Sequence, residues 1–491
     1  MLFNSFIFLI FLAAGWLVYV LLPRRRWRVW FLLAASYFFY GYWDWRFTIL
    51  LLLSTTVDYA VGRALGAAGE QRRRRRLLLA SCAVNLGILG FFKYFDFFTE
   101  SAEAAAGALG LPLELLHLNL VLPVGISFYT FKTLSYTIDV YRRTIPPTRS
   151  FTDYALFVGF FPNLVAGPID RAGSILPQIS RLARPRALQV REGLVLIVTG
   201  LFMKVLIGDA SARIVNNIFG QPELYRAGEV LAAWVLFGIQ VYADFAGYSN
   251  IARGAGRLFG VELMKNFDQP YLSSSFSEFW RRWHISLSTW IWDYIFNPLM
   301  TWRLRRAQIR GADEPGGQMR SAYAYAVIVT MLLCGLWHGA GFVFVLWGGI
   351  HGLYLAVERL LVYRGKTIPL RRRIRSAKSL VRFAAGWVST QALVGIAWIL
   401  FRSGSLGEAG RILGRIAAWE PSEHTARLAA MTLVFGMAVM GLDLAERRGG
   451  GEFYLLRLRP ATAAAVCCAA TAAVLLYMAT TKPLPFVYFQ F

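Results

Sequence analysis

Long apolar runs follow one another along almost the whole of this 491-residue chain, and they constrain its fold more than any other feature. About 20 consecutive apolar residues in a helix cross the hydrocarbon core of a lipid bilayer. A soluble chain of this length would carry about 25% charged residues, whereas only 16% are charged here. We therefore predict an all-α polytopic membrane protein, with one membrane-embedded domain over residues 1–491 and no sizeable soluble domain.

The formal net charge of +24 raises the question of a nucleic-acid partner. The basic residues, however, gather in short clusters between the apolar runs, as they do in the cytoplasmic loops of membrane proteins. Such clusters suit anionic lipid headgroups or the phosphates of a cytosolic cofactor. We therefore expect the lipid bilayer, and no nucleic acid, as a partner. The clusters lie at residues 24–26, 72–76, 303–306, 371–373 and 447–448.

The basic clusters also order the apolar runs across the membrane. No basic region precedes the first run, so we expect an uncleaved span with its N-terminus outside. Residues 151–168 and 276–300 contain or adjoin prolines and glycines, and we predict re-entrant or interfacial segments there. We place the polar loop 301–320 inside and the tail 481–491 outside, and expect roughly ten to thirteen membrane segments. Simple spans are predicted at residues 3–22, 29–43, 46–63, 77–98, 119–140, 192–212, 229–251, 321–338, 341–362, 382–402, 425–444 and 461–480.

Several common catalytic motifs are absent from the sequence. It has no Gly-x-Ser-x-Gly elbow, no His-Glu-x-x-His and no Walker-type phosphate loop. The cysteines lack metal-ligand spacing, so we expect buried free thiols and no metal site. Histidine, present five times, is then the natural proton acceptor near neutral pH. The cysteines are Cys82, Cys334, Cys467 and Cys468.

His338 and His351 lie in a stretch that is otherwise almost wholly apolar. A histidine in hydrocarbon is costly because lipid cannot satisfy its ring nitrogens. Glycines beside both allow another backbone or a substrate to come close. We interpret His338 as a catalytic base in the membrane, with an interhelical hydrogen bond as the alternative. A helix over 321–338 that turns at 339–341 would leave His351 at a different depth, so the two need not act as a pair. A structural role explains His351 at least equally well.

A third histidine lies in the stretch at residues 276–300. If that stretch is helical, His284 shares one face with Trp280, Trp283 and Leu287, while the neighbouring arginines point elsewhere. The spacing is equally compatible with a functional histidine and with an interfacial helix that carries a structural one.

Asp244 and Tyr248 stand four residues apart on one face of an apolar span. An acidic group inside a membrane suggests a transport pathway or a buried partner. Pairing with an arginine from elsewhere in the chain explains Asp244 better than catalysis does.

At these residues the sequence resembles the membrane-bound O-acyltransferase superfamily, and specifically its bacterial alginate O-acetyltransferase-like branch. The resemblance implies a multi-helix disc with re-entrant segments around a central tunnel, in the inner (cytoplasmic) membrane of a bacterial cell. It also implies that His338 is catalytic, that His284 is a second catalytic histidine near the tunnel, and that an acyl thioester, acetyl-CoA above all, enters from the cytoplasm. The segments that carry the resemblance are 1–5, 122–131, 161–169, 242–249, 279–288 and 336–340. The residues expected to line or support the tunnel are Asp244, Tyr248, Asp293, Trp337 and His351.

The tail at residues 486–491 resembles a tyrosine motif of related export systems, in which a tyrosine carries the acyl group to an outer transferase. Tyr488 is therefore a candidate acyl carrier, with an aromatic anchor at the membrane interface as the alternative. The resemblance further implies an extracytoplasmic partner with an SGNH-hydrolase-like domain that completes transfer to a polysaccharide. The sequence departs from the family pattern at Trp292, before Asp293, where arginine is usual, and at Asn250, where aspartate is common. These departures concern the cytoplasmic entrance and the identity of the donor or acceptor, and leave the central histidine untouched.

We predict from these features a membrane O-acetyltransferase that moves an acetyl group from a cytoplasmic thioester across the membrane to an extracytoplasmic polysaccharide. Alginate, cellulose, peptidoglycan and other exopolymers fit equally. One alternative is a transporter or flippase for the acyl donor, in which the histidines and Asp244 relay protons. That alternative predicts internal inverted repeats, and the sequence shows none. Another alternative is a scaffold that recruits a separate enzyme.

Overall fold

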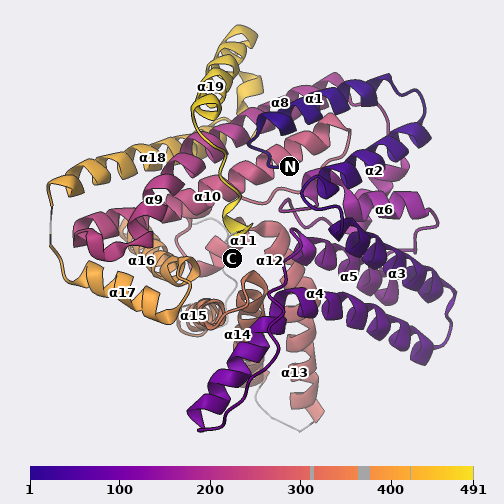
Figure 1. The fold of residues 1–491 in the computed structure, drawn as a ribbon, viewed down its shortest axis with the longest axis horizontal. Coiled ribbons are helices and arrows are strands. Elements are labelled where there is room, and N and C mark those ends of the chain that lie inside the picture. Colours follow the sequence, from indigo (N-terminus) through magenta and orange to yellow (C-terminus); the bar gives the residue numbers. More distant parts are fainter. Residues whose placement is uncertain (310–314, 363–375, 421, 490–491) are drawn as a thin grey trace. The chain divides into compact units, whose positions relative to one another are not determined.

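The computed structural model describes residues 1–309, 315–362, 376–420 and 422–489, and most of these residues lie in helices (Figure 1). None of the residues in these ranges lies in a β-strand. Nine of the described helices are long and apolar enough to cross a membrane. The prediction of an all-α polytopic membrane protein is therefore confirmed. The nine helices are Phe47–Ala67, Gln71–Ala108, Ala187–Gly220, Ala227–Leu258, Gly316–His338, Phe342–Leu361, Ala377–Arg402, Glu423–Arg448 and Pro460–Thr480.

Three predicted spans correspond to shorter helices. These are α1 (Phe6–Leu21), α2 (Arg25–Gly41) and α5 (Ile126–Arg142), with 16, 17 and 17 residues. Helix α5 begins at Ile126 and not at residue 119, because Gly125 adopts a left-handed φ of +81° that a helix cannot contain. The segment before it is not helical.

The described residues form two compact units, each assembled from segments that are distant in sequence. The first unit comprises residues 1–202, 248–264 and 452–489. Within it α5 packs against α3 and α4, and α2 packs against α6. The prediction that residues 1–491 form one domain stays a prediction. The other elements of this unit are α3 (Phe47–Ala67), α4 (Gln71–Ala108), α6 (Phe151–Gly159), η1 (Phe161–Asn163), α7 (Ala172–Ser180), α8 (Ala187–Leu201), η7 (Tyr454–Arg457), α19 (Pro460–Thr480) and η8 (Val487–Phe489).

The interruption predicted at residues 151–168 is confirmed in this first unit. Helix α6 ends at Gly159, and a short 3-10 turn containing Pro162 follows. The chain then continues without helix, although it is buried. Lys132 supports this segment, since its Nζ donates to the Asn163 side-chain oxygen at 3.0 Å. Buried backbone outside a helix needs such polar partners.

The second unit comprises residues 203–247 and 265–451. Helices α14 and α15 pack more closely than any other helix pair of this unit, and they lie side by side as a hairpin (Figure 1). Helix α10 contributes to both units, since its residues up to Gly247 belong to the second unit and those from Tyr248 belong to the first. The elements are η2 (Phe202–Asp209), α9 (Ala210–Gly220), η3 (Pro222–Leu224), α10 (Ala227–Leu258), η4 (Pro270–Leu272), α11 (Phe276–Arg282), α12 (Ile285–Ile291), η5 (Trp292–Phe296), α13 (Asn297–Ile309), α14 (Pro315–His338), α15 (Phe342–Val357), η6 (Glu358–Val362), α16 (Ala377–Arg402), α17 (Leu406–Ala417) and α18 (Glu423–Arg448).

The polar stretch at residues 301–320 is largely helical, so its prediction as a loop was wrong. Helix α13 reaches Ile309, and α14 begins at Pro315. Arginine is a good helix former, and Arg306 gains a further contact because its guanidinium lies 4.9 Å over the Trp302 ring. Three predicted features lie outside the described residues, namely the centre of this loop at 310–314, the basic cluster 371–373 and the last two residues of the tail.

The four cysteines are free thiols, as predicted. Cys334 is buried, but Cys468 is exposed on α19, and Cys82 and Cys467 are half-buried. The prediction of burial was therefore wrong for Cys468. An apolar side chain on a membrane-spanning helix can face lipid as well as protein.

Candidate active site

His338 is the last residue of α14, directly before the turn into α15. The two helices approach each other closely at glycines. A Cβ added at Gly348 would overlap the carbonyl oxygen of Met331, and one at Gly335 would overlap the carbonyl oxygen of Phe344. The predicted approach of another backbone beside His338 is thus confirmed, and it fixes the spacing of side chains between the two helices.

Aromatic rings surround His338, which is only 6% exposed. Its ring centroid lies 4.8 Å from Trp337, 5.0 Å from Trp347 and 5.3 Å from Phe401. All three rings meet the imidazole at steep angles, between 72° and 82°. An apolar enclosure of this kind keeps water away and strengthens every electrostatic interaction inside it.

Trp347 also packs against His351, with ring centroids 4.7 Å apart. His351 lies on α15 and is 1% exposed. On its other side Trp280 of α11 donates its Nε1–H to His351 Nδ1 at 3.4 Å. The Trp347 indole therefore contacts both histidines of the hairpin, a link that their spacing in the sequence did not predict.

His284 lies between α11 and α12, directly before Ile285, the first residue of α12. Its φ of +42° is left-handed, which is costly for a residue with a Cβ. The prediction of a helix through His284 was therefore wrong. The shared face that this helix would give to His284, Trp280 and Leu287 does not exist, because the chain turns at His284.

Asn266 explains the turn, and sequence reasoning missed this residue. Its backbone carbonyl accepts from the amide of Ile285 at 2.9 Å. Its side-chain oxygen accepts from the amide and the hydroxyl of Ser286, at 3.2 and 2.9 Å. These bonds satisfy the first amides of α12 from outside the helix, and they hold the backbone in its left-handed conformation.

The same Asn266 oxygen determines the tautomer of His284. It accepts from a backbone N–H, which can only donate, so the atom is an oxygen and not the amide nitrogen. His284 Nδ1 lies 3.1 Å from this acceptor and therefore carries the proton. The Nε2 atom then holds the lone pair, and it is buried with no hydrogen-bond partner in the described part of the chain.

The three histidines lie in one series of alternating rings. In order these are His284, Trp337, His338, Trp347 and His351, and we call them the histidine–tryptophan row. Successive ring centroids are 6.3, 4.8, 5.0 and 4.7 Å apart. The start of α12, the end of α14 and the middle of α15 contribute to it, so no single sequence spacing could reveal it.

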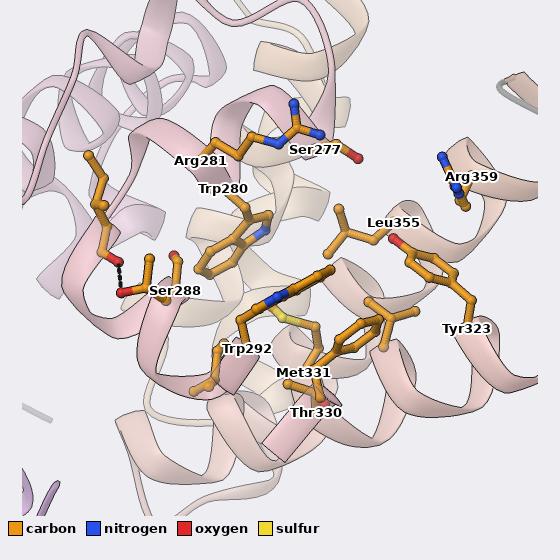
Figure 2. Close-up of a pocket in the computed structure, with 15 residues that line it drawn as sticks. Ser277, Trp280, Arg281, Ser288, Trp292, Tyr323, Thr330, Met331, Leu355 and Arg359 are labelled. Carbon is orange, nitrogen blue, oxygen red and sulfur yellow. Dashed lines mark hydrogen bonds between the residues drawn. The ribbon is translucent and has the colours of Figure 1, made fainter. Parts of the chain in front are cut away.

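A pocket of about 350 Å³ lies next to the row, because Trp280, which lines the pocket, contacts His351 of the row. In Figure 2, Trp280 and Trp292 lie toward the middle of the pocket, with Arg281 above them in the view and Tyr323 and Arg359 to the right. Most of the lining is apolar, and the two arginines are its cationic groups. Such a pocket suits a ligand that joins an apolar or aromatic body to anionic groups.

Asp244 is buried in an ion pair, and its chain neighbour contacts the row. Lys204 Nζ lies 2.7 Å from the Asp244 carboxylate and 2.6 Å from that of Asp209. The expected pairing of Asp244 is therefore observed, with a lysine in place of the expected arginine. The next residue, Phe245, packs against the His284 ring at 4.7 Å. The role of Asp244 as a support of the site stays a prediction.

Asp293, another predicted support, lies in the π-helical turn η5 and is exposed. It is therefore outside the row, although its neighbour Trp292 lines the pocket. Among the residues described, no group of three or more histidine, cysteine or acidic side chains is arranged to hold a metal ion.

Tyr248 and Tyr488 both belong to the first unit. The Tyr248 ring stacks on Phe3 at 4.4 Å and meets Phe486 at 4.9 Å. Phe486 in turn stacks on Tyr488 at 5.3 Å. Asn4 Nδ2 donates to the carbonyl of Leu484 at 3.0 Å, upstream of these rings. Tyr488 is therefore held in a packed segment, and Tyr248 contacts that segment.

The family model for the membrane-bound O-acyltransferase family (MBOAT) matches residues 142–390 of this chain. The matched region contains all three histidines of the row and every residue of the pocket. The chain belongs to the membrane-bound O-acyltransferase family, and it is an O-acyltransferase of the membrane.

Curated relatives share most of the chain. A probable alginate O-acetylase of Pseudomonas syringae pv. tomato is 38% identical over 429 residues, which cover 86% of this chain and 77% of the relative. A peptidoglycan O-acetyltransferase of Helicobacter pylori is 31% identical over an alignment that covers 84% of this chain and 79% of the relative. A teichoic acid D-alanyltransferase of Streptococcus thermophilus is 27% identical over an alignment that covers 52% of this chain and 61% of the relative. The names of all three relatives describe acyl transfer.

Proposed function

We propose that this protein moves an acetyl group from a cytoplasmic thioester, acetyl-CoA, across the bacterial inner membrane for O-acetylation of an extracytoplasmic polysaccharide. The observation that carries the proposal is His338, buried in the histidine–tryptophan row of a membrane-bound O-acyltransferase. The relatives named for O-acetylation of alginate and of peptidoglycan support acetyl as the acyl group.

His338 is the general base in this proposal. It takes the proton from the acceptor hydroxyl while the hydroxyl oxygen attacks the carbonyl carbon of the thioester. A tetrahedral intermediate with an anionic oxygen forms. Its carbon–sulfur bond then breaks, and the leaving thiolate takes the proton back from His338. The products are an acetyl ester and a free thiol, and the histidine returns to its neutral state.

His284 is the second catalytic histidine in this scheme. Because Asn266 holds the proton on Nδ1, the free lone pair of His284 is on Nε2. That lone pair accepts the single O–H of the acceptor as it enters the site, and the hydroxyl then turns the same proton to His338, which removes it. Trp337 contacts both His284 and His338, which supports their action on one reacting group.

The pocket beside the row is the donor site in this proposal. Arg281 and Arg359 supply positive charge for the phosphates of acetyl-CoA, and Trp292 supplies an aromatic surface. Trp280 lines the pocket and contacts His351. It therefore marks the end of the pocket from which the thioester reaches the row.

Tyr488 is the acyl carrier in this proposal, and an extracytoplasmic SGNH-like acetyltransferase takes the acetyl group from it to the polysaccharide. The packed position of Tyr488 against Phe486 supports a defined role for the tail. A sugar hydroxyl is the other candidate acceptor.

The test is to incubate the purified, reconstituted protein with labelled acetyl-CoA and to map the label by mass spectrometry. Label on Tyr488 supports the carrier role, and label that reaches only added glycan supports direct transfer. Label that crosses the membrane as intact acetyl-CoA, with no acetyl ester formed, would contradict the proposal and favour a transporter.

A further inference from the structure

His351 carries its proton on Nε2. An indole nitrogen can donate a hydrogen bond but cannot accept one. Trp280 Nε1–H donates to His351 Nδ1, so this nitrogen presents its lone pair. A neutral imidazole has only one N–H, which must then be at Nε2. His351 is thus the opposite tautomer from His284.

The Nε2–H of His351 is buried and has no hydrogen-bond partner in the described part of the chain. The neighbouring Nε1–H of Trp347 is also buried without a hydrogen-bond partner among the described residues. Two donors on neighbouring rings, whose centroids are 4.7 Å apart, therefore lack an acceptor among the described residues. Buried donors without acceptors are costly, and native proteins rarely retain them without a use.

The place of these donors suggests their use. Trp347 contacts His338 as closely as it contacts His351, with centroids 5.0 and 4.7 Å apart. One donor therefore lies on the ring that contacts His338, and the other lies on the next ring of the row. In acyl transfer the carbonyl oxygen gains negative charge as the tetrahedral intermediate forms, and N–H donors fixed in advance stabilise that charge.

We propose that His351 is the oxyanion donor of this enzyme, with its Nε2–H directed at the carbonyl oxygen of the acyl group. Trp280 is the positioning residue that holds the required tautomer. The inference rests on the proposed transfer at His338 and adds a catalytic group to it. His351 gives and receives no proton. The acceptor proton moves to His338 and then to the leaving thiolate, while the His351 hydrogen bond strengthens with the oxyanion and weakens when it collapses.

A pair of substitutions separates donation from the other uses of a histidine. In His351→Gln, the amide oxygen accepts from Trp280 and the amide nitrogen donates in place of Nε2, but the group cannot act as a base. In His351→Leu, both functions are removed. We expect His351→Leu to lose about 10²- to 10³-fold in kcat, with KM for acetyl-CoA nearly unchanged. We expect His351→Gln to stay within about tenfold of the unchanged enzyme, with the same pH profile.

Two results would overturn the inference. Full activity of His351→Leu would show that the donor is not used. A His351→Gln enzyme as slow as His351→Leu, with both proteins eluting and inserting normally, would show that the enzyme needs something other than a donor.

A measurement of the tautomer judges the inference even if acetyl-CoA is not the donor. We expect the nitrogen NMR shifts of labelled His351 in the solubilised full chain to show protonation at Nε2. Trp280→Phe should remove the preference of His351 for protonation at Nε2, because Nδ1 then no longer accepts a hydrogen bond from the indole. Trp387→Phe is the matched control, because Trp387 Nε1 donates to the Tyr271 carbonyl at 2.7 Å, away from the row. A proton on His351 Nδ1 in the unchanged protein would contradict the proposed role.

Discussion

The spacing between α14 and α15 gives a sharp test of whether the row must be intact. At Gly348 an added Cβ would overlap the carbonyl oxygen of Met331, which is backbone and cannot rotate away. Gly348→Ala therefore has to push the two helices apart. Overpacking of this kind costs about 1–3 kcal/mol, and Trp347, the preceding residue, moves with the backbone.

The consequence for activity is larger than the consequence for stability. Trp347 separates His338 from His351 by centroid distances of 5.0 and 4.7 Å, so a small helix displacement changes both contacts. A misplacement of about 1 Å in an active site can cost about 100-fold in rate. We expect Gly348→Ala to lose acetyl transfer to about this extent while it still inserts into the membrane.

Gly349→Ala is the matched control for this prediction. The nearest atom to a Cβ there is Leu332 Cδ2 at 3.3 Å, the end of a flexible side chain. We expect it to retain most activity. The assay is single-turnover transfer of labelled acetyl in reconstituted vesicles, with thermal unfolding in detergent measured in parallel. Equal activity of Gly348→Ala and the unchanged protein would refute the dependence of the row on helix spacing.

Three further predictions concern the surroundings of the row. Asn266→Ala leaves at least one buried donor of the turn unsatisfied, so thermal unfolding should show that the free energy of unfolding falls by about 1–3 kcal/mol. NMR should then show a mixture of the two tautomers of His284, and an unchanged tautomer would contradict the role of Asn266. Arg281→Gln removes a cation from the pocket and should raise KM for acetyl-CoA about tenfold with little change in kcat, and unchanged KM would remove the pocket from the donor path. Phe486→Ala removes the ring that stacks on Tyr488, so label on Tyr488 and single-turnover cleavage of acetyl-CoA should fall together. Equal labelling would show that this contact does not position the tail.

The fold was largely accessible from the sequence because apolar run length is a local property. Most long runs form a helix close to the predicted bounds, as at α19 (Pro460–Thr480), whereas α4 (Gln71–Ala108) extends well beyond the span predicted at 77–98. Two other differences from the predicted bounds arise at particular residues. Gly125 delays the start of α5 by taking a left-handed conformation, and the arginine-rich stretch before Ile309 forms helix where polarity suggested a loop.

The site was only partly accessible. The cost of placing a histidine in hydrocarbon points to His338 from composition alone, and the structure places it among aromatic rings with only 6% of the residue exposed. The break at His284 was missed because its cause, Asn266, lies 18 residues away in sequence and acts through hydrogen bonds. The link from His351 to Trp280 spans 71 residues, so helical spacing carries no signal of it.

Loss of the base at His338 tests the central claim most directly. General base catalysis contributes about 10²- to 10⁴-fold, so we expect single-turnover acetyl transfer by His338→Gln to fall by at least about 100-fold while insertion and thermal unfolding stay normal. His117→Gln is the control, because His117 pairs with Glu103 at 2.9 Å in the first unit. Transfer by His338→Gln at the rate of the unchanged protein would contradict the assignment of His338 as the base.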